Sequence, residues 1–231
     1  VRPHWQPLAG VINRWTLDQR MAMASAASRM IEDLGTTFNV FSDVVGAGQP
    51  YELDTIPLVI PPAEWARVSA GLSQRVRLLD AVLADLYGPQ TLLQQGLVPP
   101  DLVHSSESFL NYTCGIQPPG GRFLVTVGCD LVRTANGAWS VLRDHAGTPG
   151  GVGQVLENRN VISNLFADPF DTMKIARLGG FLNLERSTFQ EFSLHRGEEA
   201  NVVFLTPGFR HPSYFEHAYQ ARLLGFPLVE T

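Results

Sequence analysis

Two long stretches of the chain repeat apolar residues at the spacing of an α-helix. From Leu17 to Leu34 helix-forming residues run up to Gly35, and glycine commonly ends a helix. From Pro62 the apolar positions recur every three to four residues until Gly88-Pro89, which predicts the strongest helix of the chain. Its apolar face consists of Val68, Leu72, Val76, Leu79, Leu83 and Leu86. Shorter helical patterns cover 89–96, 99–104, 157–165, part of 168–195 and 213–224.

Strand-like patterns lie between these helices. The run TTFNVFS at 36–42 is rich in β-forming residues, and the runs 121–133 and 138–144 are joined across Asn136-Gly137. An Asn-Gly pair between two such runs predicts a β-hairpin with a two-residue loop. The runs 201–208 and 226–230 flank the last helix and predict a Rossmann-like β-α-β half unit.

These patterns predict a mixed α/β (α+β) fold in three parts. Residues 1–50 are expected to form an N-terminal helix and strand, and residues 51–198 an α+β lobe around the hairpin. Residues 199–231 are expected to begin a Rossmann-like unit that the chain leaves truncated. We find no internal repeat and no low-complexity tract.

Composition excludes several classes of protein. Apolar residues make up 45% of the 231 residues and charged residues 17%, as in ordinary globular domains. The net charge of −5, without a basic cluster, argues against a nucleic-acid partner. No apolar run has the length of a bilayer span, and no signal-peptide core is seen, so we expect a cytoplasmic protein without a membrane partner. Cys114 and Cys129 lack metal-site spacing and are expected to be buried free thiols.

The hairpin carries the first candidate site. A two-residue loop at Asn136-Gly137 places Asp130 opposite Arg143 and Gly128 opposite His145, so that Asp130, Arg143 and His145 share one face. Either Asp130 and Arg143 form an exposed cross-strand ion pair, or this face binds a ligand. Glycines follow at 147, 150, 151 and 153, but no Gly-Lys-Ser/Thr accompanies them, so this loop is not a P-loop.

Several long segments, in order, carry a family resemblance. They are YELDTIPLVIPPAEW, GLSQRVRLLDAVLADLYGPQTLLQQGLVP, DLVRTANGAWSVL, LENR and VFLTPGFRHPSYFEHAYQARLLGFPLVE. Through them the chain resembles the circularly permuted ATP-grasp proteins of type 2, relatives of glutathionylspermidine synthetase. RPHW and ADLYGPQ are typical of the longer members fused to an alpha-E domain. The resemblance implies part of a permuted ATP-grasp fold, with an N-terminal helical segment, a central hairpin sheet with helices, and the start of the Rossmann-like unit.

The resemblance also implies a chemistry. ATP-grasp ligases bind ATP with Mg²⁺, phosphorylate a carboxylate substrate, and let an amine attack the acyl phosphate. The implied partners are small-molecule or peptide carboxylates and amines, together with the remainder of the same polypeptide. Asp130 takes the place of the first metal-binding carboxylate, whereas the family's Glu-Asp-Asn is replaced by Arg143-Asp144-His145. Arginine cannot ligate Mg²⁺, so we expect a remodelled site that binds an anion.

Further candidates follow from the matched segments. The predicted catalytic residues are Arg159 and Glu216, the predicted cofactor-binding residues are Gly150, Gly151, Asn158, Thr206 and Gly208, and the predicted metal ligand is Asp130. Arg159 either faces a phosphate or forms a helix-start salt bridge, and Thr206–Gly208 is either a ligand-binding switch point or a tight turn. Of Glu216 and His217, one is expected to face the cleft and the other to bond the scaffold.

Two functional hypotheses remain. The first is a piece of an ATP-grasp-type carboxylate–amine ligase with a remodelled metal site, inactive without its missing half. The only lysine, Lys174, does not resemble the family's phosphate-gripping lysine, which lies in a segment absent here. The second is a non-catalytic ATP-grasp-like protein that binds an anionic ligand or serves as a scaffold for a partner protein. On the long helix, Arg75 is expected to be structural.

Overall fold

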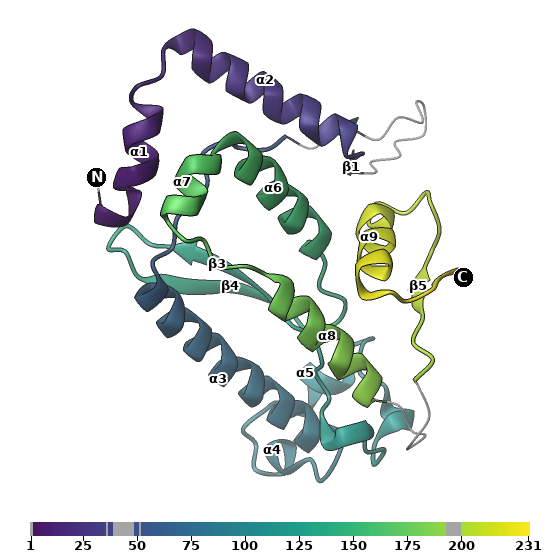
Figure 1. Cartoon of the computed structure of the whole chain (residues 1–231). Coiled ribbons are helices and arrows are strands. Elements are labelled where there is room, and N and C mark those ends of the chain that lie inside the picture. Colours follow the sequence, from purple (N-terminus) through teal and green to yellow (C-terminus); the bar gives the residue numbers. More distant parts are fainter. Residues whose placement is uncertain (1, 36, 39–48, 51, 193–199) are drawn as a thin grey trace. The chain divides into compact units, whose positions relative to one another are not determined.

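The computed structural model describes residues 2–35, 37–38, 49–50, 52–192 and 200–231. Within them the chain forms a mixed α/β structure that is mostly helical, with three two-stranded sheets. The helices are η1 (Pro3–Trp5), α1 (Gln6–Ile12), α2 (Leu17–Asp33), α3 (Pro62–Leu86), α4 (Thr91–Gln94), α5 (Pro100–His104), η2 (Asn111–Thr113), η3 (Pro119–Gly121), α6 (Val152–Leu165), α7 (Ala167–Thr172), α8 (Gly179–Glu191) and α9 (Tyr214–Leu224) (Figure 1). The strands are β1 (Thr37–Phe38), β2 (Gln49–Pro50), β3 (Gly128–Arg133), β4 (Trp139–His145), β5 (Phe204–Thr206) and β6 (Leu228–Glu230).

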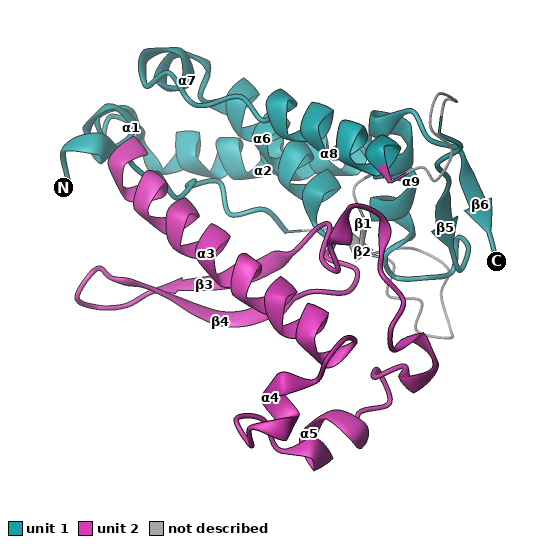
Figure 2. Ribbon diagram, turned by 90° about the horizontal axis from the view of Figure 1, so that it is seen from below, with its two compact units in different colours: residues 1–61, 150–191, 199–231 teal, residues 62–149, 192–198 magenta. Residues whose placement is uncertain are grey.

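The chain divides into two compact units, coloured separately in Figure 2. Unit 1 comprises residues 1–61, 150–191 and 199–231, and unit 2 comprises residues 62–149 and 192–198. Each unit is therefore built from its own set of elements and is considered by itself. The three domains expected from the sequence are not tested by this division and stay predictions.

Unit 1 is organised around α2 and α6. Helix α2 begins with a capping box, in which Thr16 and Gln19 satisfy each other's backbone N–H groups, as the polar start of this helix favours. Ile31 of α2 is 1% exposed and packs with Val161 of α6, which is fully buried. A second apolar cluster joins Leu8, Ile162 and Phe166. The predicted helix at 17–34 is confirmed.

The C-terminal part of unit 1 is a β-α-β element. Strands β5 and β6 run parallel, with Phe204 opposite Leu228 and Thr206 opposite Glu230, and α9 connects them. Gly225 ends α9 in the left-handed conformation that glycine adopts without strain. The predicted Rossmann-like half unit is confirmed at this level.

Unit 2 combines the long helix α3 with the β3–β4 hairpin. The 25-residue helix matches the predicted strongest helix, and its end is followed by Gly88-Pro89 as expected. Gly88 is required there, because an added Cβ would lie 2.6 Å from the carbonyl oxygen of Ala84. Helices α4 and α5 confirm the two shorter helical patterns that follow.

The hairpin has the predicted pairing at Asp130, but its loop differs from the predicted one. The loop is not the expected two-residue turn, since Thr134 pairs with Ala138 and the amide of Gly137 donates to the carbonyl of Thr134. Gly137 has φ of 85°, so the three-residue loop ends in a left-handed glycine, as is common for hairpin loops of this length. This loop shifts the pairing by one residue, and an irregularity between Asp130 and Leu131 shifts it back. Asp130 therefore does face Arg143, as predicted.

Three smaller expectations need correction. The first hairpin strand begins at Gly128 rather than near residue 121, and α6 begins at Val152 rather than at 157. Cys114 is exposed and Cys129 is only partly buried, although both are free thiols as expected. Thr37–Phe38 of the strand predicted at 36–42 is strand, and residues 36 and 39–42 lie outside the described residues. Within the described parts of the chain, no helix combines the length and apolarity that crossing a bilayer requires.

Candidate functional site

The first candidate site is the face of the hairpin that carries Asp130, Arg143 and His145. His145 Nε2 lies 2.9 Å from Asp130 Oδ2, with 40% of the His145 side chain and 56% of the Asp130 side chain exposed. Arg143 is exposed and has no hydrogen bond or ion pair within the described residues. The expected alternative of an Asp130–Arg143 ion pair is therefore wrong. Asp130 pairs with the imidazole, and the guanidinium is left available to an anion.

This set of side chains does not fit a magnesium site. Mg²⁺ requires near-octahedral coordination by oxygen, and this face offers one carboxylate beside an imidazole and a permanently charged guanidinium. No group of three or more His, Cys, Asp or Glu side chains placed for a metal is found in the part of the chain that the structure describes. The hairpin face is therefore suited to anions rather than to the two-cation arrangement of conventional ligases.

The neighbouring strand positions face α3 and are held there by ion pairs. Asp144 binds Arg75 in a two-pronged contact, with Nη2–Oδ2 of 2.7 Å and Nε–Oδ1 of 2.9 Å. Glu64 accepts hydrogen bonds from the Trp139 indole at 2.6 Å and forms an ion pair with Arg133 at 2.8 Å. Arg75 is thus structural, as predicted.

The sequence reasoning missed Glu64. Its separation from Arg75 is eleven residues, close to three helical turns, which places both on one face of α3. That spacing, combined with strand alternation on the hairpin, was a signal that could have found the Glu64–Trp139 anchor.

The ion pairs also set the ionisation of this side of the hairpin. The hydrogen bonds from Arg75 lower the pKa of Asp144 below its ordinary value. Burial raises the pKa of the Cys129 thiol, and the adjacent Asp144 carboxylate adds to that effect. The thiolate form of Cys129 is therefore disfavoured at this position.

In unit 1, Glu216 closes the N-terminus of α6. Its carboxylate is 4% exposed and accepts hydrogen bonds from the amides of Gly153 at 2.9 Å and Gln154 at 3.4 Å. Gln220 donates a third at 2.7 Å. A carboxylate in this position interacts favourably with the helix dipole and satisfies amides that would otherwise lack acceptors. The predicted catalytic role of Glu216 is not tested by these contacts.

Close packing of α6 on α9 depends on glycine. A Cβ at Gly153 would lie 2.9 Å from Glu216 Oε2 and 2.9 Å from a ring carbon of Tyr219. Burial of the Tyr219 phenol and its hydrogen bond with Glu157 raise its pKa to about 12. Polar groups thus fill the space between these two helices.

The predicted glycine loop borders a small cavity. Gly150 and Gly151 line a space of about 260 Å³ together with Val152, Val155, Leu156, Leu178 and Phe181. Its lining is apolar apart from the backbone, and the nearby amides of Gly153 and Gln154 are already bonded to Glu216. A phosphate held by those two amides would have to displace the Glu216 carboxylate.

Arg159 and Asn158 lie within α6, because the helix starts earlier than predicted. Arg159 donates to the carbonyl of Ala176 and lies over the Phe170 ring, 5.7 Å from its centroid. The alternative of a helix-start salt bridge is therefore wrong. The expected roles of both residues in holding a phosphate or cofactor stay predictions.

The switch point after β5 forms a compact turn. Thr206 is 2% exposed, and its hydroxyl oxygen accepts from the amide of Gly208 and lies 3.1 Å from His217 Nδ1. Burial and the neighbouring His211 ring, 5.7 Å away, lower the pKa of His217. Glu216 and His217 therefore both contact the scaffold, although only one of them was expected to do so.

One further buried carboxyl escaped the sequence reasoning. Glu185 on α8 is 9% exposed, and its Oε2 has no hydrogen-bond partner among the described residues. Burial raises its pKa, and the charge of Glu216 raises it further. No feature of the sequence distinguished this glutamate from those on solvent-exposed helical faces.

The candidate residues are divided between the units. Asp130, Arg143 and His145 belong to unit 2, whereas the glycine loop, Asn158, Arg159, Thr206, Gly208 and Glu216 belong to unit 1. Within unit 1 the structure joins Glu216 to the helix that follows the glycine loop, and it joins Thr206 to Gly208.

Comparison with known families agrees with the motifs in this arrangement. The profile of the family described as circularly permuted ATP-grasp type 2 matches residues 57–231, which include the hairpin, the glycine loop and the β5-α9-β6 element. The chain belongs to this family. The resemblance to circularly permuted ATP-grasp proteins that the sequence motifs indicated is thereby confirmed.

Relatives of this ATP-grasp chain are longer. Uncharacterized protein sll0335 of Synechocystis sp. is 36% identical over 229 residues, covering 99% of this chain and 48% of that protein. Uncharacterized protein Rv2411c of Mycobacterium tuberculosis is 36% identical over 209 residues, covering 90% of the chain and 37% of the relative. Uncharacterized protein Rv2567 of the same organism is 33% identical over 239 residues, covering 100% of the chain and 27% of the relative.

The chain therefore spans about half or less of the length of the curated relatives it matches. ATP-grasp proteins typically bind ATP and Mg²⁺, and the ligases among them act on carboxylates and amines. Membership in the family suggests this general chemistry, and the relatives show no particular activity for the chain.

Proposed function

We propose that the full-length protein is an ATP-dependent carboxylate–amine ligase in which the hairpin face binds phosphate through Arg143 rather than through magnesium ligands. In this reaction the γ-phosphoryl group of ATP passes to the substrate carboxylate. The amine then attacks the acyl carbon and inorganic phosphate leaves. The family supports the reaction class, and the residues of the hairpin support the change in how phosphate is held.

One observation carries the proposal. Arg143 stands opposite Asp130 on the exposed face, yet Asp130 is paired with His145, so the guanidinium has no partner among the described residues. A guanidinium presents parallel N–H donors that match the oxygens of a phosphate. In this role Arg143 orients and neutralises the anion, and Asp130 positions His145 beside it.

The candidate residues of unit 1 have proposed roles of their own. Gly150, Gly151, Asn158, Thr206 and Gly208 are proposed to border the nucleotide or substrate through backbone and amide groups. Arg159 and Glu216 are proposed to act on the reacting groups, which requires each to leave its present contact with Ala176 or with the α6 amides.

The test is nucleotide binding by the full-length protein, measured by calorimetry with a non-hydrolysable ATP analogue with and without Mg²⁺. Arg143→Ala is expected to weaken binding about ten-fold or more, because a charge-assisted hydrogen bond to phosphate is lost. Arg122→Ala is the matched control, since Arg122 is also an exposed arginine of unit 2 without a described partner. Equal binding by the wild type and Arg143→Ala would refute the proposed role of Arg143.

Two further variants separate phosphate binding through arginine from binding through a metal. If Asp130 is a metal ligand, Asp130→Ala abolishes binding of the Mg²⁺ complex. If Arg143 has replaced the metal ligands, Asp130→Ala retains magnesium-independent binding. The double variant Arg143→Glu/His145→Asn restores the family's side chains and is expected to make binding depend on Mg²⁺.

A second candidate function is a non-catalytic protein that binds an anion or a partner protein. It is favoured by the contact of Glu216 with the α6 amides, which occupies donors that a phosphate would use. Failure of the full-length protein to bind any nucleotide, with inorganic phosphate still bound at Arg143, would support this alternative over the ligase.

A further inference from the structure

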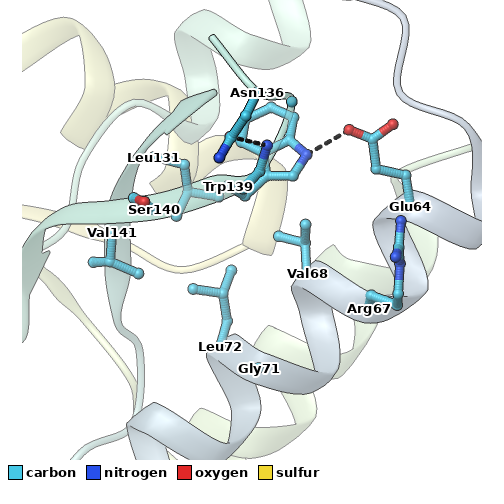
Figure 3. A pocket seen from close by; sticks show the side chains of 12 residues that line it. Glu64, Arg67, Val68, Gly71, Leu72, Leu131, Asn136, Trp139, Ser140 and Val141 are labelled. Atoms are coloured by element: carbon cyan, nitrogen blue, oxygen red, sulfur yellow. Dashed lines mark hydrogen bonds between the residues drawn. The ribbon is translucent and has the colours of Figure 1, made fainter. Parts of the chain in front are cut away.

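A cavity lies within unit 2, between α3 and the β3–β4 hairpin. Its volume is about 540 Å³, within the range of small-molecule sites. Figure 3 shows Val68 and Leu72 pointing from α3 toward Leu131, Val141 and Trp139 of the hairpin. These five side chains are only partly buried, so the helix and the hairpin do not close on each other. An apolar space remains between them.

One wall of this cavity is held rigidly. The Trp139 indole N–H donates to Glu64, and the Arg133 guanidinium lies 5.7 Å from the indole ring centroid. Glu64 is in turn paired with Arg133. An aromatic ring fixed at its polar atom presents flat apolar surface without losing further side-chain freedom on binding. The cavity is therefore prepared for a planar or apolar group.

The charge at the cavity is unbalanced. Its two charged lining residues are Glu64 and Arg67. The Glu64 carboxylate is neutralised by Arg133, whereas Arg67 has no hydrogen bond or ion pair in the described part of the chain. Arg67 lies next to Glu64 at the edge of the cavity (Figure 3). The uncompensated charge beside the apolar space is thus positive.

We propose that this cavity binds an amphipathic anion, with its aromatic or apolar body against Trp139 and its carboxylate or phosphate on Arg67. The site lies on the face of the hairpin opposite Asp130 and His145, and it does not rest on the proposed nucleotide chemistry. Gly71 supports the assignment, because an added Cβ there meets no atom within 4 Å and the helix surface is open toward the cavity.

The test uses para-fluorophenylpropionate with the full-length protein, followed by ligand-observed fluorine NMR. The neutral para-fluorophenylpropanol is the matched ligand. We expect saturable binding of the acid and weaker binding of the alcohol. Arg67→Gln is expected to weaken binding of the acid about ten-fold and to leave the alcohol unchanged. Arg77→Gln, an exposed arginine of the same helix outside the cavity, is expected to have no effect.

Gly71→Leu tests the location. Leucine favours the helix more than glycine does, so the variant is expected to stay folded, while its side chain fills the cavity and abolishes binding. Ala70→Leu adds the same side chain to an exposed neighbouring position outside the lining and is expected to retain binding. Equal affinity for the acid and the alcohol would overturn the proposed recognition of an anion by Arg67. Binding of the acid by Gly71→Leu would overturn the proposed location of the site. Absence of saturable binding to the wild type also overturns the proposal.

Discussion

Replacing Glu216 by glutamine is expected to loosen the start of α6 even if the same residue takes part in catalysis. The carboxylate is buried and accepts from the amides of Gly153 and Gln154, and glutamine keeps its volume but offers only one acceptor oxygen. The amide group also places its NH₂ against donors that require an acceptor. A glutamine oxygen at the Oε2 position can still accept from Gly153 and Gln154, but the negative charge and the second contact of the Gly153 amide, with Oε1, are lost.

The size of the effect follows from these contacts. A hydrogen bond to a charged group contributes about 1.5–3 kcal/mol, and a buried donor left unsatisfied costs about 1–3 kcal/mol. Water can reach the helix end when it opens locally and replace part of the lost hydrogen bonding. We therefore expect the free energy of this opening to fall by about 2 kcal/mol for Glu216→Gln and by about 3–5 kcal/mol for Glu216→Ala, which removes every acceptor. Two kcal/mol corresponds to about thirty-fold faster exchange of the protected amides.

Hydrogen exchange read by mass spectrometry on peptides spanning 150–156 measures this opening in the full-length protein. Glu191→Gln, at an exposed glutamate of α8, is the control and is expected to leave the exchange unchanged. Unchanged exchange in Glu216→Gln would refute the capping argument. Lost activity with unchanged exchange would instead assign Glu216 to the chemistry.

Three other predictions concern packing and pH. Gly153→Ala is expected to lower the free energy of unfolding by about 1–3 kcal/mol in denaturant titration, because its Cβ would lie 2.9 Å from Glu216 Oε2. Gly71→Ala is the control, since an added Cβ there meets open space and should not lower the stability. Equal stability of the two variants would contradict the close-packing argument. The pKa of Asp144 is lowered, so its pairing with Arg75 stabilises the fold above the ordinary pKa of 3.8, and this stabilisation is lost as the pH falls through the lowered pKa. Arg75→Gln should therefore flatten the acid side of a plot of Tm against pH. An acid side unchanged from the wild type would refute this. The pKa of Tyr219 is raised from 10.0 to about 12, which predicts an ionisation step near pH 12 in an absorbance titration. The stabilisation that comes with this shift is present below pH 10 and is lost between these two values. Tyr219→Phe should remove the step near pH 12, and its persistence would contradict the assignment.

In the hairpin, the local sequence determined the position of the turn, whereas the tertiary structure determined the pairing of the strands. The Asn136-Gly137 signal correctly located the turn, but it did not reveal that Gly137 alone would be left-handed in a three-residue loop. A single extra loop residue would have turned Asp130 to the other face, since side chains alternate along a strand. The irregularity between Asp130 and Leu131 cancels the shift. No local pattern encodes such a compensation.

The helices α2, α3 and α9, the parallel β5–β6 pair and the family followed from the sequence alone, because apolar spacing, capping residues and ordered motifs are local properties of the chain. The partners of charged side chains were decided only in the folded structure. Asp130 lies opposite Arg143, as expected, but pairs with His145, while Glu216 binds the Gly153 amide 63 residues earlier in the chain. Charged groups pair with whichever opposite charge or free donor the packing brings within about 3 Å, and that distance depends on register and helix contacts that distant residues determine together.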